Sequence, residues 1–328
     1  MDTDTENDPA YRGRYAPSPT GRLHLGNLRT ALLAWLHARL ANGRFILRID
    51  DLDTPRNKPG AIGQIISDLR WLGIDWDEGP DIGGDHGPYL QSERTGLYDA
   101  WFKRLTDRRR VFPCICSRKD VRRAQSAPNL GQTEPVYPGT CRPPANPPPV
   151  AGPMEQPVSW RFLTRGLKIT SRDELSEPAT QSLDRTVGDF VVRRRDGLYA
   201  YQFATVVDDG LMGVTDIVRG DDLIGSMPRQ LALFDALGFT RPRFLHVSLM
   251  RDRHGRRMAK RDGSDSLEEW KRRDGSPERL LGELAFSAGL VGAVSPTNCR
   301  ELLRGLTMPR FRENLLRTRD PAGTGTES

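Results

Sequence analysis

The chain has 328 residues, a length that suggests about two structural units, and 37% of its residues are apolar. Together with 32 glycines, this composition excludes a mainly disordered chain, and no apolar run approaches the roughly 20 residues that span a bilayer. The net charge of +6, from 49 Lys and Arg against 43 Asp and Glu, is compatible with a polyanionic partner without requiring one. The N-terminus, MDTDTENDPAYRGR, lacks the basic start and apolar stretch of a secretory signal, so we expect a cytoplasmic protein without a membrane segment.

The first third of the chain has an α/β order of elements. Residues 1–10 are expected to form a disordered tail, followed by a short strand that enters the proline- and glycine-rich loop of GRYAPSPTG. The spacing of apolar residues predicts four further elements, namely a helix over 28–43, a strand over 45–49, and helices over 61–73 and 89–109. Strand, loop, helix and strand in this order predict a parallel α/β unit over residues 11–111.

The pattern changes near residue 112. Eight prolines between Pro138 and Pro157 exclude a helix or a central strand there, so we predict an inserted subdomain over 112–185. Strand-like runs return over 186–265, in VGDFVVRR and LYAYQFATVVDDGLMGVTDIVRGDDLI, followed by a helix at 227–237 and the apolar strand RFLHVSLM. Residues 266–328 are predicted to hold a short helical region, with a helix from Pro277 and a mostly polar tail.

The loop before the first helix, PSPTGRLHLGN, combines glycines with a histidine. A helix start presents unpaired N–H groups and the positive end of the helix dipole, which suits a phosphate. Gly21 and Gly26 permit close approach of the backbone, and His24 can donate a hydrogen bond to a phosphate oxygen. Taken alone, a loop histidine is more often a surface residue, and the string is not a Walker-type P-loop.

The complete string is more specific than its parts. YAPSPTGRLHLGN resembles the HIGH signature of the class I aminoacyl-tRNA synthetases, and in particular that of the glutamyl branch. The resemblance implies a Rossmann-like α/β fold in which His24 and Gly26 lie against the phosphates of ATP and stabilise charge during adenylate formation. It also assigns Pro17, Gly21 and Asn27 to ATP binding.

A second basic segment, RMAKRDG at residues 257–263, follows the apolar strand. Such a loop is ordinarily a solvated turn, but Lys260 is one of only six lysines against 43 arginines, a bias that genomic base composition explains. The segment resembles the KMSKS loop of the same class, which implies that Lys260 closes over the phosphates of ATP and stabilises developing charge. Arg257 keeps the charge of the motif's first lysine, whereas Ala259 and Arg261 lack the hydroxyl groups of its serines.

Four segments, RYAPS, RIDDLD, YQFATVVDD and VRGDDL, resemble the glutamate-binding parts of the glutamyl family. Arginines can clamp carboxylates with paired hydrogen bonds, and an acidic side chain can bind an ammonium group. Each such residue taken singly is more often packed or capping a helix. The resemblance implies a glutamate site formed by Arg14, Tyr15, Ala16, Pro17, Ser18, Asp50, Tyr201 and Arg219. The family usually has Glu where Asp50 stands, so this shorter carboxylate must reach about one methylene further.

Three of the four cysteines, Cys114, Cys116 and Cys141, fall within 28 residues, whereas Cys299 is remote. This clustering indicates a metal site before redox chemistry, with buried free cysteines as the alternative. The arrangement resembles that of the small glutamyl-Q tRNA(Asp) synthetases and of some glutamyl-tRNA synthetases. The resemblance implies one structural Zn²⁺ held by the three cysteines and Tyr137, with a water or another residue as an alternative fourth ligand.

The length of the chain distinguishes branches of the family. The resemblance covers residues 12–265, and the 65 residues after Gly263 are too few for the helical anticodon-binding domain of a glutamyl-tRNA synthetase. We therefore expect a member of the truncated glutamyl-Q branch. This implies a monomeric ligase that activates L-glutamate with ATP and Mg²⁺ without tRNA, and then transfers it to the queuosine base at the wobble position of tRNA(Asp).

Two alternatives stay open at this point. The first is a minimal glutamyl-tRNA synthetase that charges the 3′ end of tRNA(Glu). The second is a catalytically silent homologue that binds RNA, although the presence of His24, Gly26, Lys260 and Arg219 argues against it.

Overall fold

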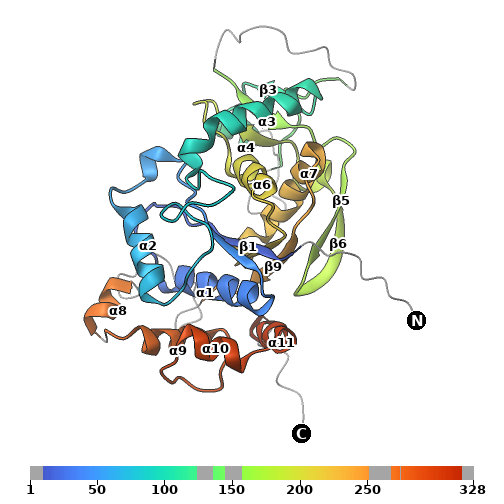
Figure 1. The fold of residues 1–328 in the computed structure, drawn as a ribbon. Helices are drawn as coiled ribbons and strands as arrows, with labels where there is room; N and C mark the ends of the chain where they lie inside the picture. Colours follow the sequence, from blue (N-terminus) through green and yellow to red (C-terminus); the bar gives the residue numbers. More distant parts are fainter. Residues whose placement is uncertain (1–9, 124–135, 145–156, 251–266, 274, 320–328) are drawn as a thin grey trace.

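Two β-sheets organise the chain in the computed structural model, which describes residues 10–123, 136–144, 157–250, 267–273 and 275–319 (Figure 1). The larger sheet has six strands in the order β2-β1-β8-β9-β5-β6, and the smaller has three in the order β3-β4-β7. Helices pack on both faces of the larger sheet, with α1 on one side and α6 and α7 on the other (Figure 1). The predicted α/β class is therefore confirmed.

The larger sheet is mixed, not wholly parallel as predicted. Its strands are β1 (Arg12–Tyr15), β2 (Arg44–Leu47), β8 (Asp216–Gly220), β9 (Arg243–Val247), β5 (Lys168–Asp173) and β6 (Ser176–Ser182). The first five are parallel to their neighbours, whereas β6 runs antiparallel to β5. Only two residues, Glu174 and Leu175, connect β5 to β6, and such a short connection forces the two strands to run in opposite directions.

The predicted insertion at 112–185 contributes strands to both sheets. The smaller, antiparallel sheet consists of β3 (Val111–Cys114), β4 (Ser159–Phe162) and β7 (Phe190–Arg193). The hairpin of β5 and β6 comes from the same stretch of sequence but extends the larger sheet instead. This stretch is therefore joined to the α/β core by direct strand pairing between β5 and β9. The proposed domain boundaries themselves stay a prediction.

The helices predicted around this core are present, with shifted ends. They are α1 (Leu25–Leu40), α2 (Ala61–Trp71), α3 (Thr95–Asp107) and α7 (Met227–Leu237). Two short helices, α4 (Arg118–Arg123) and α5 (Leu183–Thr186), were not predicted. α1 begins three residues before the predicted start because His24 caps it. α3 begins later than predicted because short 3₁₀ turns occupy Gln91–Arg94, as they also do at Thr54–Arg56 and Asp221–Ser226.

The strand-like run predicted through YQFATVVDD is wrong, because Tyr201–Leu211 forms helix α6. Thr205, Val206 and Val207 favour a strand locally, but tertiary packing overrides this preference. Residues 203–209 are all buried, and their apolar members join a core with α3 and α7. The rings of Phe203 and Phe102 meet edge to face in this core, with their centroids 6.2 Å apart.

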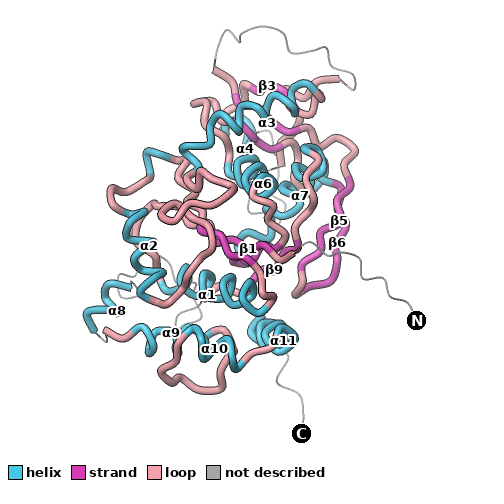
Figure 2. Tube along the Cα trace, viewed as in Figure 1, coloured by secondary structure: helices cyan, strands magenta, loops and turns pink. Residues whose placement is uncertain are grey.

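The C-terminal region consists of helices joined by loops, as the cyan and pink segments of Figure 2 show. It contains α8 (Leu267–Arg273), α9 (Pro277–Ser287), α10 (Cys299–Gly305) and α11 (Met308–Arg319). The helix predicted from Pro277 is confirmed, but the stretch predicted as a polar tail contains two further helices. Leu281 and Phe311 are buried in the same core as Leu28 and Leu32 of α1, so this region covers the outer face of α1. None of the described helices is both long and apolar enough to cross a membrane.

Candidate active site

The histidine of the first motif caps the helix that follows it. His24 is the N-cap residue of α1, and its Nδ1 accepts a hydrogen bond from the backbone N–H of Asn27 at 3.3 Å. The Asn27 side chain in turn accepts from the backbone N–H of His24 at 3.3 Å, which completes a capping box. Because Nδ1 is an acceptor, the proton of the neutral ring lies on Nε2, which makes this nitrogen a donor suited to a phosphate oxygen.

Glycine is required at two positions of the motif for different structural reasons. Gly21 has a φ of +149°, a backbone conformation that side-chain-bearing residues rarely adopt. A Cβ at Gly26 would lie 3.1 Å from two atoms of the His24 ring, so glycine leaves the space that this ring occupies. The loop is therefore shaped around the imidazole.

A cavity of about 300 Å³ lies where the carboxyl ends of β1 and β8 meet the N-terminus of α1. The chain leaves these neighbouring strands toward opposite edges of the sheet, which is where α/β proteins bind ligands. Eleven residues predicted from the sequence line this cavity, namely Arg14, Tyr15, Ala16, Pro17, Ser18, Gly21, His24, Gly26, Asn27, Tyr201 and Arg219. The structure thus brings these predicted ATP and glutamate residues together from two segments more than 170 residues apart.

Asp50 lies in a second, larger cavity next to the first. This cavity has a volume of about 900 Å³ and lies between the α/β core and the segment that contains Cys116. Ser18 and Tyr201 line both cavities, so the two spaces adjoin at these side chains. Burial raises the pKa of Asp50 to about 6, although the neighbouring Arg48 charge acts in the opposite direction.

An alternating chain of charges links Arg14 to Asp50. Arg14 binds both carboxylate oxygens of Asp209 on α6, at 3.2 and 3.4 Å. Arg48 donates to the same Asp209 at 2.7 Å and, through its Nε, to Asp50 at 2.7 Å. The order Arg14–Asp209–Arg48–Asp50 therefore places two predicted glutamate-binding charges at the ends of one buried network. Such a network holds charged side chains in fixed positions before a ligand arrives.

Sequence reasoning missed the centre of this network. Arg48 is wholly buried, and although burial disfavours its charge, the surrounding carboxylates hold its pKa above the ordinary value. The neighbouring Asp208 accepts hydrogen bonds from Arg94 at 2.6 Å, Gln91 at 2.7 Å and Tyr98 at 2.9 Å. The available signal was a charged residue inside an apolar segment, Arg48 in FILRI and Asp208 after ATVV, because such charges are buried only with partners.

Arg219 and Tyr201 reach the smaller cavity from different elements. Arg219 is on β8 and is 4% exposed, and burial lowers its pKa below the ordinary value. Tyr201 is the first residue of α6 and is 41% exposed. A buried cation and an accessible hydroxyl thus face the same space, an arrangement suited to a carboxylate ligand.

Lys260, predicted to contact ATP, lies outside the described residues, as does the rest of the basic segment at 251–266. The residues immediately before it are described, and two of them, Leu249 and Met250, line the smaller cavity. Arg29 of α1 donates to the backbone carbonyl of Ser248, which ties this strand end to the helix that begins at His24. The described residues that precede the second motif in the chain therefore lie at the cavity that the first motif borders.

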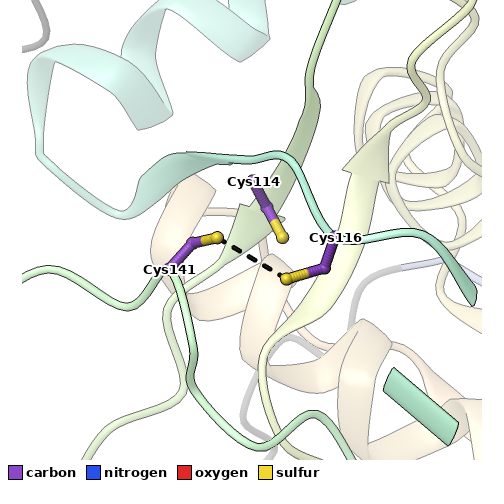
Figure 3. A group of neighbouring side chains, drawn as sticks. All are labelled: Cys114, Cys116 and Cys141. Carbon is purple, nitrogen blue, oxygen red and sulfur yellow. Dashed lines mark hydrogen bonds between the residues drawn. The ribbon is translucent and has the colours of Figure 1, made fainter. Parts of the chain in front are cut away.

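The three clustered cysteines converge at the end of β3, as Figure 3 shows. The sulfur atoms of Cys114, Cys116 and Cys141 all lie within 4.8 Å of one another, and those of Cys116 and Cys141 are 3.6 Å apart. The hydroxyl oxygen of Tyr137 lies 3.4 Å from the Cys114 sulfur and 3.9 Å from that of Cys116. All four predicted ligands therefore surround one point, whereas Cys299 is buried elsewhere, beside Leu72.

Comparison with known proteins establishes the family. Residues 10–309 match the family described as tRNA synthetases class I (E and Q), catalytic domain. The chain belongs to this family. The predicted resemblance to the glutamyl branch of the class I synthetases is thereby confirmed, and the fold is the α/β fold of that class with a mixed sheet.

Several curated relatives of this class I synthetase are named glutamyl-Q tRNA(Asp) synthetase. The protein of Symbiobacterium thermophilum is 47% identical over 308 residues, which cover 91% of this chain and 93% of that protein. The protein of Deinococcus radiodurans is 49% identical over 278 residues, covering 84% of this chain and 88% of that protein. Glutamate–tRNA ligase 1 of Halorhodospira halophila is 42% identical, covering 85% of this chain and 59% of the ligase.

The fold also matches solved synthetase structures. The crystal structure of glutamate-tRNA synthetase from Elizabethkingia anophelis superposes with a TM-score of 0.76 at 27% sequence identity. The match covers 92% of this chain and 66% of that chain. The arrangement of sheet and helices around the cavity is therefore that of a glutamyl-type class I synthetase.

Proposed function

We propose that this chain is a ligase that activates L-glutamate with ATP and transfers it to the queuosine base of tRNA(Asp). The observation that carries this proposal is the near end-to-end match to relatives of that name, at 47% and 49% identity over 93% and 88% of their lengths. Relatives named glutamate–tRNA ligase match at lower identity and over 59% of their lengths. These comparisons favour the queuosine acceptor over the 3′ end of tRNA(Glu).

The smaller cavity binds glutamate in this proposal. Arg219 and Arg14 supply positive charge for carboxylates, Tyr201 supplies a hydroxyl group, and the backbone of residues 15–18 forms the wall. Asp50, which lines the adjoining larger cavity, binds the α-ammonium group. The buried ion pairs of Arg14 and Asp50 fix their positions, so little conformational freedom is lost when glutamate binds.

ATP binds at the start of α1. An oxygen of the glutamate α-carboxylate attacks the α-phosphorus, the bond from this phosphorus to the bridging oxygen of the β-phosphate breaks, and pyrophosphate leaves. His24, through Nε2–H, and the N-terminus of α1 stabilise the charge on the phosphates, and the space at Gly26 admits the imidazole ring. Lys260 and Mg²⁺ are assigned the same role, as the family membership implies.

In the second step the glutamyl group is transferred to an acceptor bound in the larger cavity. A ring hydroxyl of queuosine attacks the carbonyl carbon of the glutamyl-adenylate, the bond to the AMP phosphate oxygen breaks, and the hydroxyl proton is released. Ser18 and Tyr201 border both cavities, so an acceptor in the larger one can reach an adenylate in the smaller one. We assign this step to positioning of the two reactants.

We also propose that the cysteine cluster holds one structural Zn²⁺. A tetrahedral zinc with Zn–S distances of about 2.3 Å separates two sulfurs by about 3.8 Å, close to the 3.6 Å between Cys116 and Cys141. The Tyr137 oxygen accepts the backbone N–H of Cys141 at 2.7 Å, and Arg161 donates to the Cys114 sulfur at 3.2 Å. These donors suit a negatively charged ligand set, and the zinc would join β3 to the segment at 136–144.

Two assays test the proposed function. Glutamate-dependent exchange of labelled pyrophosphate into ATP, measured without tRNA, should be observed with the purified protein and should be strongly reduced in the His24→Ala variant. Absence of exchange in the wild type would support the silent RNA-binding alternative. Transfer of labelled glutamate to tRNA(Asp) should require queuosine, and charging of tRNA(Glu) alone would defeat the assignment. We further place the protein in the cytoplasm as a monomer, a state that light scattering measures directly.

A further inference from the structure

We propose that four linked side chains, Arg219–His246–Asp173–Arg319, of which the first three are buried, position the glutamate-binding arginine and connect it to the C-terminal helix α11. His246, Asp173 and Arg319 are positioning residues in this proposal, because none of them lines the smaller cavity. The inference rests on the proposed function, which assigns Arg219 to glutamate.

The first link joins two neighbouring strands. Arg219 on β8 and His246 on β9 are direct register partners, and Arg219 Nε donates to His246 Nε2 at 2.9 Å. Phe244, two residues earlier on β9, stacks on the His246 ring. The Arg219 guanidinium carbon lies 5.0 Å from the centre of the Phe244 ring. His246 is wholly buried, so water does not compete for its ring nitrogens.

The second link determines which nitrogen of His246 carries the proton. Asp173 on β5 accepts from the Nδ1 of His246 at 2.6 Å and from its backbone N–H at 2.9 Å. A carboxylate at Nδ1 keeps the proton there, which leaves a lone pair on Nε2 to accept the N–H of Arg219. Burial also lowers the pKa of His246, which favours this neutral form.

The third link comes from the end of the described chain. Arg319 of α11 donates to the second carboxylate oxygen of Asp173 at 2.9 Å and to the carbonyl of Leu175 at 2.9 Å. Asp173 is thus held between His246 and a cation from the C-terminal region. The C-terminal helices therefore act on the site through this contact as well as through their packing on α1.

The four linked side chains affect glutamate binding through the N–H donors of Arg219. Arginine has five N–H groups, and three are taken by His246, by the Gln230 side chain at 2.6 Å and by the carbonyl of Leu223 at 3.3 Å. These acceptors hold the guanidinium plane and leave two donors for Tyr201 and a ligand carboxylate. If His246 carried its proton on Nε2, two N–H donors would face each other, and the Arg219 guanidinium group would lose one of its three hydrogen-bond acceptors.

The test compares Asp173→Asn and Arg319→Met with the control Arg312→Met. Asparagine retains the shape of Asp173 but cannot accept from all of its present donors. Arg312 is also on α11 and pairs with Glu174 at 2.8 Å. Its variant therefore removes an ion pair next to the four linked side chains and leaves those four residues unchanged. In pyrophosphate exchange, KM for glutamate should rise about 10-fold or more in Asp173→Asn, as for a lost hydrogen bond to a charged group. KM for glutamate should rise less in Arg319→Met. KM for ATP in both variants, and both KM values of the Arg312→Met control, should stay within about twofold of the wild-type values.

Ring ¹⁵N NMR of His246 in the wild type gives a readout independent of activity and should show the proton on Nδ1. A proton on Nε2, or equal rises of both KM values in the variants, would overturn the inference. Unchanged glutamate KM in a folded Asp173→Asn or Arg319→Met variant would do the same. Absence of exchange in the wild type would instead defeat the proposed function, so the two failures are distinguishable.

Discussion

Arg48 donates to Asp209 at 2.7 Å, and neither side chain is exposed to solvent. The pair joins the residue that follows β2 to α6 and connects Arg14 to Asp50 through shared partners. Because both predicted glutamate-binding charges depend on it, the pair links stability of the core to geometry of the site. A buried charge whose partner is removed is far more costly than an exposed one.

Replacement of Arg48 by methionine should lower the free energy of unfolding by about 3–5 kcal/mol, because Asp50 would lose its cationic partner, and Asp208 and Asp209 would each keep only one. The control Lys103→Met breaks an exposed pair with Asp107 and should cost under about 0.5 kcal/mol. Urea unfolding followed by circular dichroism measures both values. Equal costs for the two variants would show that the buried network contributes no more than a surface pair.

The role of Asp50 predicts a pH dependence. Because its pKa is raised to about 6, the carboxyl is charged above that pH and attracts the ammonium of glutamate, and it becomes neutral below it. kcat/KM for glutamate in the exchange reaction should therefore fall as pH decreases through about 6, by up to tenfold per unit. Asp50→Asn should be less active, and its kcat/KM should not show this decrease through about pH 6. The ionisation of ATP affects both proteins alike. Superimposable pH profiles would exclude Asp50 as the ammonium ligand.

His24 has a structural role and a chemical role that two substitutions separate. His24→Ala removes the cap of α1, at a cost of about 1 kcal/mol, and should lower the exchange rate about 100- to 1000-fold. His24→Asn keeps a good N-cap acceptor and should recover the stability but not the rate. Thermal unfolding and pyrophosphate exchange provide the two measurements. Recovery of the rate in His24→Asn would assign the histidine to capping alone.

The proposed zinc site predicts a selective loss of metal. The wild type should contain one equivalent of zinc per chain by elemental analysis, and the Cys114→Ser, Cys116→Ser double variant should contain almost none. Cys299→Ser is the matched control, because Cys299 is a buried cysteine outside the cluster and should leave the zinc content unchanged. Zinc retained by the double variant, or absent from the wild type, would contradict the assignment.

Tyr137 can be tested as a ligand separately. Tyr137→Phe keeps the ring but removes the oxygen that lies 3.4 Å from the Cys114 sulfur. We expect the variant to keep its zinc at saturation but to lose it at a lower chelator concentration than the wild type, since three thiolates and a water can complete a tetrahedral site. Competition with a colorimetric chelator measures this difference. Equal release curves would favour a water or another residue as the fourth ligand.

Local motifs were enough to predict the family and eleven of the residues that line the smaller cavity. PSPTGRLHLGN forms a strand end, a loop and a helix start within one short stretch, so its chemistry depends mainly on neighbouring residues. The spacing likewise places Cys114 and Cys116 together, because a single residue separates them at a strand end, and the structure adds Cys141 to this pair. These features depend on short-range geometry, which the order of residues largely determines.

Long-range contacts were decided only by the tertiary structure. The apolar, β-branched segment at 203–207 favours a strand locally, yet burial against α3 and α7 makes it a helix, and this places Asp209 beside Arg48, 161 residues away in the chain. The pairing of β5 with β9 similarly brings Asp173 to His246. Periodicity along a chain carries no information about which distant charges meet. The sequence by itself thus determined the chemistry at the start of α1 and the membership of the family, whereas the fold decided how Arg14, Asp50 and Arg219 are held.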